Sequence, residues 1–104
     1  MHDFRLKGKY YINAKLEYEG EFRNDKKWDG KGYDVDGNII YELINGNGKV
    51  KEYDHIYNEL AFEGEYLNGE RWNGEGTEYD EYGELTFEGE YINGEKKEYT
   101  IKSN

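Results

Sequence analysis

Apolar and polar residues alternate along much of the chain with a period of two. In the stretch FEGEYLNGERWNGEG, which begins at Phe62, the residues Phe62, Gly64 and Tyr66 would share one face of an extended strand. Glu63 and Glu65 would then point to the opposite face. A helix needs an apolar stripe with a period of about 3.6 residues, and no stretch of this chain has one. The pattern therefore predicts short β-strands and no helix.

The alternating stretch recurs as a repeat. Four units open at Tyr18, Tyr41, Phe62 and Phe87, with spacings of 23, 21 and 25 residues. The second unit is shortened, and the fourth has Lys97 where the first and third have Trp28 and Trp72. Repeats of fixed period stack so that each unit contacts its neighbours. We expect one domain over residues 1–104: an elongated, twisted, single-layer antiparallel sheet of about eight strands in stacked hairpins, interrupted at the second unit and capped by residues 97–104.

The length of each turn decides which residues face each other. A two-residue Asn-Gly turn at 68–69 would pair Tyr66 with Arg71 and send Trp72 to the glutamate face. A three-residue loop at 68–70 would pair Tyr66 with Trp72 and keep the aromatic rings on one face. We therefore expect the three-residue loop. Its register lays the rings over residues without a Cβ, with Phe62, Tyr66 and Trp72 lying over Gly64, Gly74 and Gly76.

The spacers between units carry their own turn residues. Gly and Asn adopt left-handed backbone angles readily, which predicts spacer turns at Asp36-Gly37, Tyr57-Asn58 and Tyr82-Gly83.

The repeat resembles a known family. The order aromatic-x-Gly-x-aromatic, a turn, and then Trp-x-Gly-x-Gly is similar to the MORN repeat over roughly residues 10–99, most closely in Tyr18–Gly32 and Phe62–Gly76. The Tyr-Asp spacers also resemble a bacterial MORN-like group associated with antitoxins by similarity. The resemblance implies a protein-interaction or scaffold module. Phospholipid binding in that family usually depends on basic residues or membrane segments, which this pattern does not show, so we do not carry it over.

Charge narrows the choice of partner. The net charge is −10, and residues 52–95 hold fourteen acids against one base, Arg71, a net of −13. Such a segment repels nucleic-acid phosphates and anionic lipids, so we expect neither a nucleic acid nor a membrane as a direct partner. There is no cysteine, and no apolar run approaches the roughly 20 residues of a membrane span, so we expect a cytoplasmic location. Oligomeric state is left open.

The polar residues do not assemble a recognisable reaction centre. Glu63 and Glu65 recur as Glu88 and Glu90 on the solvent face, whereas acid–base catalysis needs two carboxyl groups in different environments. The stretch 34–38 (DVDGN) covers part of a calcium loop but is more typical of a turn. The two histidines, His2 and His55, are far apart, and the Gly-x-Gly pairs lack the third glycine of a phosphate loop. We expect no enzyme, no cofactor and no metal site.

Two functions fit these observations. In the first, the chain is a non-enzymatic scaffold that binds a protein or peptide, possibly a basic one, in an aromatic groove with an acidic rim. The candidate contact residues are Tyr18, Phe22, Trp28, Phe62, Tyr66, Trp72, Phe87, Tyr91, Glu63, Glu65, Glu88 and Glu90. In the second, the chain is a small acidic inhibitor, antitoxin-like, which imitates a polyanion and blocks a basic nucleic-acid-binding partner.

Overall fold

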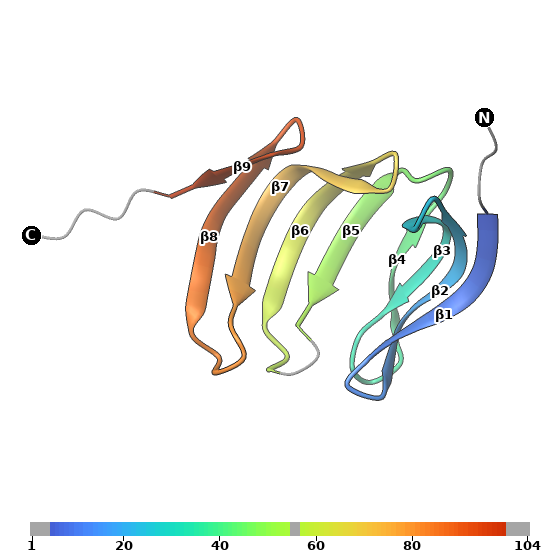
Figure 1. The fold of residues 1–104 in the computed structure, drawn as a ribbon, viewed down its shortest axis with the longest axis horizontal. Helices are drawn as coiled ribbons and strands as arrows, with labels where there is room; N and C mark the ends of the chain where they lie inside the picture. Colours follow the sequence, from blue (N-terminus) through green and yellow to red (C-terminus); the bar gives the residue numbers. More distant parts are fainter. Residues whose placement is uncertain (1–4, 55–56, 100–104) are drawn as a thin grey trace, which may run out of the picture.

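The chain folds as an all-β protein. The computed structural model describes residues 5–54 and 57–99, and these contain nine strands and no helix (Figure 1). The strands are β1 (Arg5–Ile12), β2 (Lys15–Arg23), β3 (Lys26–Tyr33), β4 (Ile39–Leu43), β5 (Gly48–Tyr53), β6 (Leu60–Leu67), β7 (Glu70–Tyr79), β8 (Leu85–Ile92) and β9 (Glu95–Glu98). Every pair of neighbouring strands is antiparallel. Residues on the β6 face expected to be apolar, Phe62 and Tyr66, are buried, and Glu63 and Glu65 are exposed.

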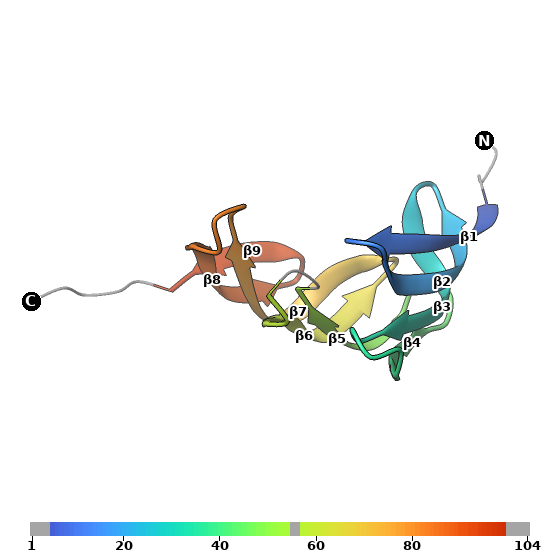
Figure 2. The same ribbon diagram turned by 90° about the horizontal axis from the view of Figure 1, so that it is seen from below.

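The strands form two sheets rather than the single-layer sheet expected. β1 to β4 make a four-stranded sheet and β5 to β9 a five-stranded sheet, each in chain order. Seen from below, the two sheets are twisted against each other (Figure 2). A single bridge, Ile44 to Asn47, joins β4 to β5 at their turn. The break falls in the shortened second unit, where the sequence predicts an interruption.

Leu43 lies at the place where the sheet divides. It stands two residues after the opening aromatic Tyr41, at the position that is Gly20 in the first unit and Gly64 in the third. A Cβ at either glycine would run into the backbone of the paired strand, at Asp29 or Asn73. Leu43 carries such a side chain and is fully buried. A Cβ at Gly48, the first residue of β5, would still meet the Glu42 carbonyl of β4 at 2.5 Å, so the two strands are close at the turn and part beyond it.

The hairpin turns contain two residues, so the expected three-residue loop is wrong. Asn68 and Gly69 have φ angles of 52° and 80°, as in a type I′ turn, and Tyr66 lies opposite Arg71. Glu65 then lies opposite Asn73, which leaves Trp72 as the extra residue of a β-bulge. The bulge shifts the alternation by one residue. For this reason Gly64 still pairs with Gly74, and Phe62 with Gly76, as predicted.

The turns share one design along the chain. Each two-residue turn begins with an asparagine whose φ lies between 48° and 52°, namely Asn13, Asn24, Asn45, Asn68 and Asn93. The three predicted spacer turns are confirmed, since Gly37, Asn58 and Gly83 all have positive φ, at 85°, 56° and 80°. Asparagine tolerates the left-handed region better than other residues with a side chain.

Aromatic rings and glycines connect neighbouring hairpins. The Tyr41 ring of β4 fills the space that a Cβ on Gly32 of β3 would occupy. The Tyr91 ring of β8 lies 2.9 Å from the Cβ position of Gly76 on β7. Phe62 covers Gly74 in its own hairpin. The prediction that a ring of the same hairpin covers Gly76 is wrong, because the ring over Gly76 is Tyr91 of the next hairpin. Rings therefore tie the second hairpin to the first and the fourth to the third.

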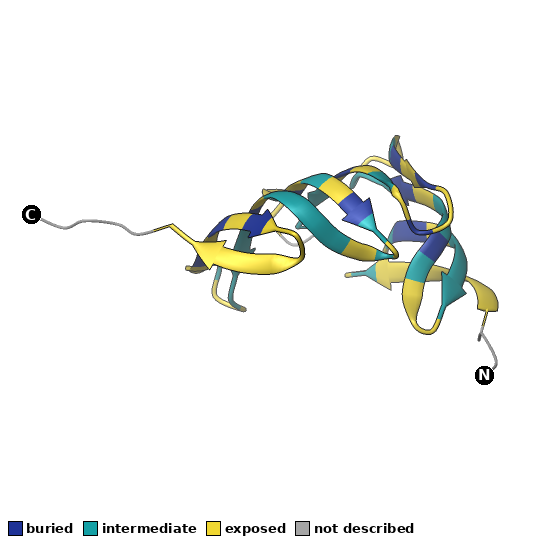
Figure 3. Cartoon of the chain, turned by 90° about the horizontal axis from the view of Figure 1, so that it is seen from above, coloured by how far each residue is buried: buried dark blue, intermediate teal, exposed yellow. Residues whose placement is uncertain are grey.

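One core runs through both sheets. It contains Tyr18, Tyr41, Leu43, Val50, Phe62, Tyr66, Phe87 and Tyr91. The buried positions lie along the inner strands, whereas β1 and β9 at the two ends are almost wholly exposed (Figure 3). The molecule measures 52 × 31 × 21 Å, so this core is thin.

Replacement of Gly32 by alanine tests the ring-on-glycine packing. The added Cβ would collide with the Tyr41 ring, so we expect Gly32→Ala to lower the free energy of unfolding by about 2 kcal/mol or more. The matched control is Gly8→Ala, whose Cβ would meet only a Phe22 ring carbon at 3.8 Å. Urea denaturation of both variants measures the difference. Equal stabilities for the two variants would contradict this packing.

Candidate functional site

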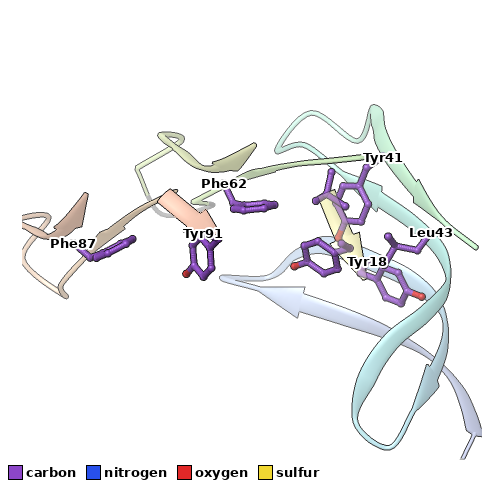
Figure 4. Packing of buried hydrophobic residues seen from close by; sticks show 8 residues of the cluster. Tyr18, Tyr41, Leu43, Phe62, Phe87 and Tyr91 are labelled. Carbon is purple, nitrogen blue, oxygen red and sulfur yellow. The ribbon is translucent and has the colours of Figure 1, made fainter. Parts of the chain in front are cut away.

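Most of the candidate aromatic residues lie inside the core. The buried ones are Tyr18, Trp28, Phe62, Tyr66, Phe87 and Tyr91, and the partly buried ones are Phe22 and Trp72. Successive rings meet edge to face, with Phe62 and Tyr91 at 5.4 Å between ring centres and Phe87 and Tyr91 at 6.1 Å (Figure 4). The rings thus bury one another, and their role as partner anchors stays a prediction.

The two tryptophans serve the turns of the following hairpins. The Trp28 ring covers Gly46, with a ring carbon 2.7 Å from the position that a Cβ would take. The Trp72 ring covers Gly94 in the same way, at 3.2 Å. Trp28 is buried and Trp72 is partly exposed. Their exposed area is too small for either ring to offer a partner its full face.

The sequence analysis missed a buried ion pair on the aromatic face. Glu17 of β2 is 5% exposed, and its carboxylate accepts hydrogen bonds from Lys27 Nζ at 2.6 and 2.9 Å. Lys27 Nζ also donates to the Tyr41 hydroxyl at 3.1 Å and stands 5.5 Å from the centre of the Tyr18 ring. A charge that is removed from water needs such partners, because burying it alone costs several kcal/mol. The pair therefore belongs to the core.

A second cluster of the same kind lies on the five-stranded sheet. Glu52 accepts hydrogen bonds from the Tyr66 hydroxyl at 2.7 Å and from Arg71 Nε at 3.2 Å. Arg71 also donates to the Tyr91 hydroxyl at 3.0 Å. Lys27 Nζ stands 3.9 Å from Glu52, so the two clusters meet across the boundary between the sheets. Charge and hydroxyl groups thus help to hold the sheets together.

The basic residues of this face occupy equivalent repeat positions. Lys27, Arg71 and Lys96 each come two residues after a two-residue turn. Each stands over an aromatic ring, namely Tyr18, Phe62 and Phe87, at 5.5, 5.0 and 4.6 Å. Lys96 also pairs with Glu78 at 2.7 Å. This recurrence was visible in the sequence, but the acids that pair with these bases lie on other strands at no fixed spacing.

Burial keeps the tyrosine hydroxyls of this face protonated. Burial raises the pKa of the Tyr18 phenol to about 12. The hydrogen bond from the Trp28 amide acts in the opposite direction but is the smaller effect. Burial followed by the charge of Glu17 raises the pKa of Tyr41, and burial followed by Glu52 raises that of Tyr66. Burial alone would lower the pKa of Arg71, but the charge of Glu52, the hydrogen bond to the Tyr91 hydroxyl and smaller contributions from Tyr66 and Tyr91 together outweigh it and raise that pKa. The phenols therefore act as neutral hydrogen-bonding groups.

The opposite face, which we call the outer face, carries the predicted glutamates. Glu63, Glu65, Glu88 and Glu90 are all exposed. The register places Glu63 opposite Glu75 and Glu75 opposite Glu90, so three carboxylates lie side by side on β6, β7 and β8. Within residues 5–54 and 57–99, none of these glutamates forms an ion pair. Like charges directly opposite each other are destabilising in a sheet.

The Asp34 side chain stabilises the first spacer turn. Both Asp34 carboxylate oxygens are used within its loop: Oδ1 accepts the amides of Asp36 and Asn38, and Oδ2 accepts the side-chain amide of Asn38. These hydrogen bonds, with Asn38 first, lower the pKa of Asp34. The described residues contain no group of three acids or histidines placed to hold a metal ion. His2 and His55 lie outside the described residues.

No family model, curated protein or solved structure matches the chain. None of the described segments forms a helix with the length and apolar character that a membrane crossing requires.

Removal of Lys27 tests the buried pair. We expect Lys27→Met to lower the free energy of unfolding by roughly 3–5 kcal/mol, because Glu17 is then left charged and buried. The double variant Lys27→Met with Glu17→Gln should recover part of that loss. Lys31→Met on the same strand is the control, since Lys31 is exposed. Thermal and urea unfolding of the set measure this, and an equal effect at positions 27 and 31 would refute it.

Proposed function

We propose that this chain is a non-enzymatic protein-interaction module, built as a MORN-like single-layer array of stacked hairpins, and that it binds a basic protein or peptide. The observation that carries the proposal is the contrast between its two faces. On the aromatic face the charges are paired into Glu17–Lys27, Glu52–Arg71 and Glu78–Lys96. On the outer face of the five-stranded sheet, no ion pair among the described residues includes Glu63, Glu65, Glu75, Glu88 or Glu90. This holds although the register places Lys51 opposite Glu63 and Lys49 opposite Glu65.

The unpaired carboxylates favour an extended, cationic ligand. Glu63 and Glu65 stand about 7 Å apart along one strand, and neighbouring strands are about 4.8 Å apart. Lysine or arginine side chains spaced two residues apart on an extended peptide match the first spacing. Their binding would also relieve the repulsion among Glu63, Glu75 and Glu90. Like charges that lie side by side cost the sheet some stability, which a basic partner restores.

In this proposal the aromatic rings act mainly as the support of the surface. Phe62 and Tyr66 are buried on the inner side of β6, directly beside the exposed Glu63 and Glu65. The buried rings hold the strand in place, and this keeps the spacing of its glutamates constant. Among the candidate contact rings, Phe22 and Trp72 keep some exposure and are the ones left to contact a partner directly.

A second candidate function is a polyanion mimic that blocks a nucleic-acid-binding protein. It is favoured by the density of acids in residues 52–95, fourteen against the single base Arg71, whose guanidinium is already paired with Glu52. Such an inhibitor would compete with nucleic acid for its target, and its association would weaken steeply with salt.

A peptide titration with charge-matched variants tests the proposal. The probe is a synthetic octapeptide of alternating lysine and serine, and calorimetry measures its affinity. We expect the triple variant Glu63→Gln, Glu75→Gln, Glu90→Gln to bind about tenfold more weakly than the parent chain.

The control removes the same number of charges elsewhere. Glu59, Glu81 and Glu84 are exposed and lie in the spacers, so their triple glutamine variant should keep most of the affinity. Equal weakening by both variants would mean that net charge alone attracts the peptide, which contradicts an outer-face site. Displacement of the chain by DNA from a lysine-rich DNA-binding protein would favour the mimic.

A further inference from the structure

The same two hydrogen bonds recur wherever one hairpin meets the turn of the next. The amide of Asn45 donates to the Asp29 carboxylate at 2.8 Å, and the amide of Gly46 donates to the Trp28 carbonyl at 2.8 Å. One repeat pair later, Asn93 donates to the Asn73 side chain at 3.0 Å, and Gly94 to the Trp72 carbonyl at 2.9 Å. The acceptor pair is thus a tryptophan followed by Asp or Asn, which we call the Trp–Asx pair.

The bulge presents this pair to the turn. Trp28 and Trp72 are the extra residues of the bulges in β2–β3 and β6–β7. The bulge turns the tryptophan carbonyl and ring toward the following hairpin, and the ring covers a glycine that leaves room for it, Gly46 or Gly94. A side chain at either glycine would meet the ring, and the positive φ of 79° or 85° also favours glycine there.

The shortened second unit keeps the hydrogen bonds but lacks the ring. Asn68 donates to the Asn47 side chain at 3.0 Å, and Gly69 donates to the Gly46 carbonyl at 2.8 Å. Lys26 takes the place of the ring, with its Cβ 2.8 Å from the Cβ position of Gly69. This contact lies beside the boundary between the two sheets, since Lys26 belongs to β3 of the four-stranded sheet.

The fourth hairpin lacks the bulge and the tryptophan. By count from the first turn residue, Asn93, Lys97 and Glu98 stand where the hairpins of the first and third units have the Trp–Asx pair, but in the register Lys97 takes the place of Asp29 and Asn73. The β8–β9 register has no bulge, so Lys97 lies directly opposite Glu90. Its ammonium pairs with Glu95 at 3.2 Å on the exposed β9 strand.

We infer that the bulged Trp–Asx pair is a docking site for an Asn–Gly turn, and that the turn belongs to a further hairpin of the same repeat. Lys97 and Glu98, which replace this pair, prevent β9 from binding such a hairpin. The determinants are local: a carbonyl and a ring from tryptophan, and a side-chain oxygen from Asp or Asn. The inference concerns how hairpins recognise each other and does not depend on the partner proposed for the outer face.

Insertion of one more unit tests the inference. A second copy of residues 62–86 is placed between Thr86 and Phe87, so that the last hairpin docks on the inserted copy. One version keeps the tryptophan and asparagine of that copy, and the other carries the equivalents of Trp72→Lys and Asn73→Glu. Hydrogen exchange of the amides that correspond to Asn93 and Gly94 is measured by NMR. We expect at least about tenfold less protection in the second version.

Point variants of the original chain keep the test decisive if the inserted chains fail to fold. Asn73→Asp retains the acceptor, as Asp29 does in the first unit, and should leave the Asn93 amide protected. Asn73→Ala removes the acceptor and should expose that amide to faster exchange by about tenfold. Equal protection with Lys–Glu and Trp–Asn pairs, or equal exchange in Asn73→Asp and Asn73→Ala, would overturn the inference.

Discussion

The fold depends on how large rings are buried in a thin protein. Among the described residues no helix covers either sheet, so the rings are buried against one another and against hairpin backbone. That backbone must lack a Cβ at the point of contact, as Gly32 does under Tyr41 and Gly76 does under Tyr91. The abundance of both aromatics and glycines follows from this one requirement, and so does the spacing of the repeat.

The same constraint separates the charges of the two faces. Rings with hydroxyl groups bring polar atoms into the core, and Lys27 and Arg71 satisfy them together with Glu17 and Glu52. No ion pair among the described residues includes the exposed outer-face glutamates Glu63, Glu65, Glu75, Glu88 and Glu90. An array built in this way has one face whose charges are satisfied internally and another whose charges are available to a partner.

The sequence predicts the alternation along a strand and the interrupted unit, but it does not predict the bulges or which side chains pair between strands. Alternation in FEGEY predicts the buried face of β6, and the short second unit predicts the interruption near Leu43. Parity alone gave the wrong turn, because a bulge at Trp72 allows a two-residue turn to keep the glycines in register. The pairing of Glu17 with Lys27 depends on the fold bringing β2 and β3 together, and one sequence offers no signal for it.

A double-mutant cycle between Tyr41 and Gly32 tests the ring-on-glycine constraint most directly. The free energy of unfolding is measured for the parent chain, Tyr41→Leu, Gly32→Ala and the double variant. If the ring is what forbids a side chain at position 32, alanine there should cost at least about 1 kcal/mol less in the Tyr41→Leu background than in the parent. An equal cost in both backgrounds would show that the glycine is needed for another reason.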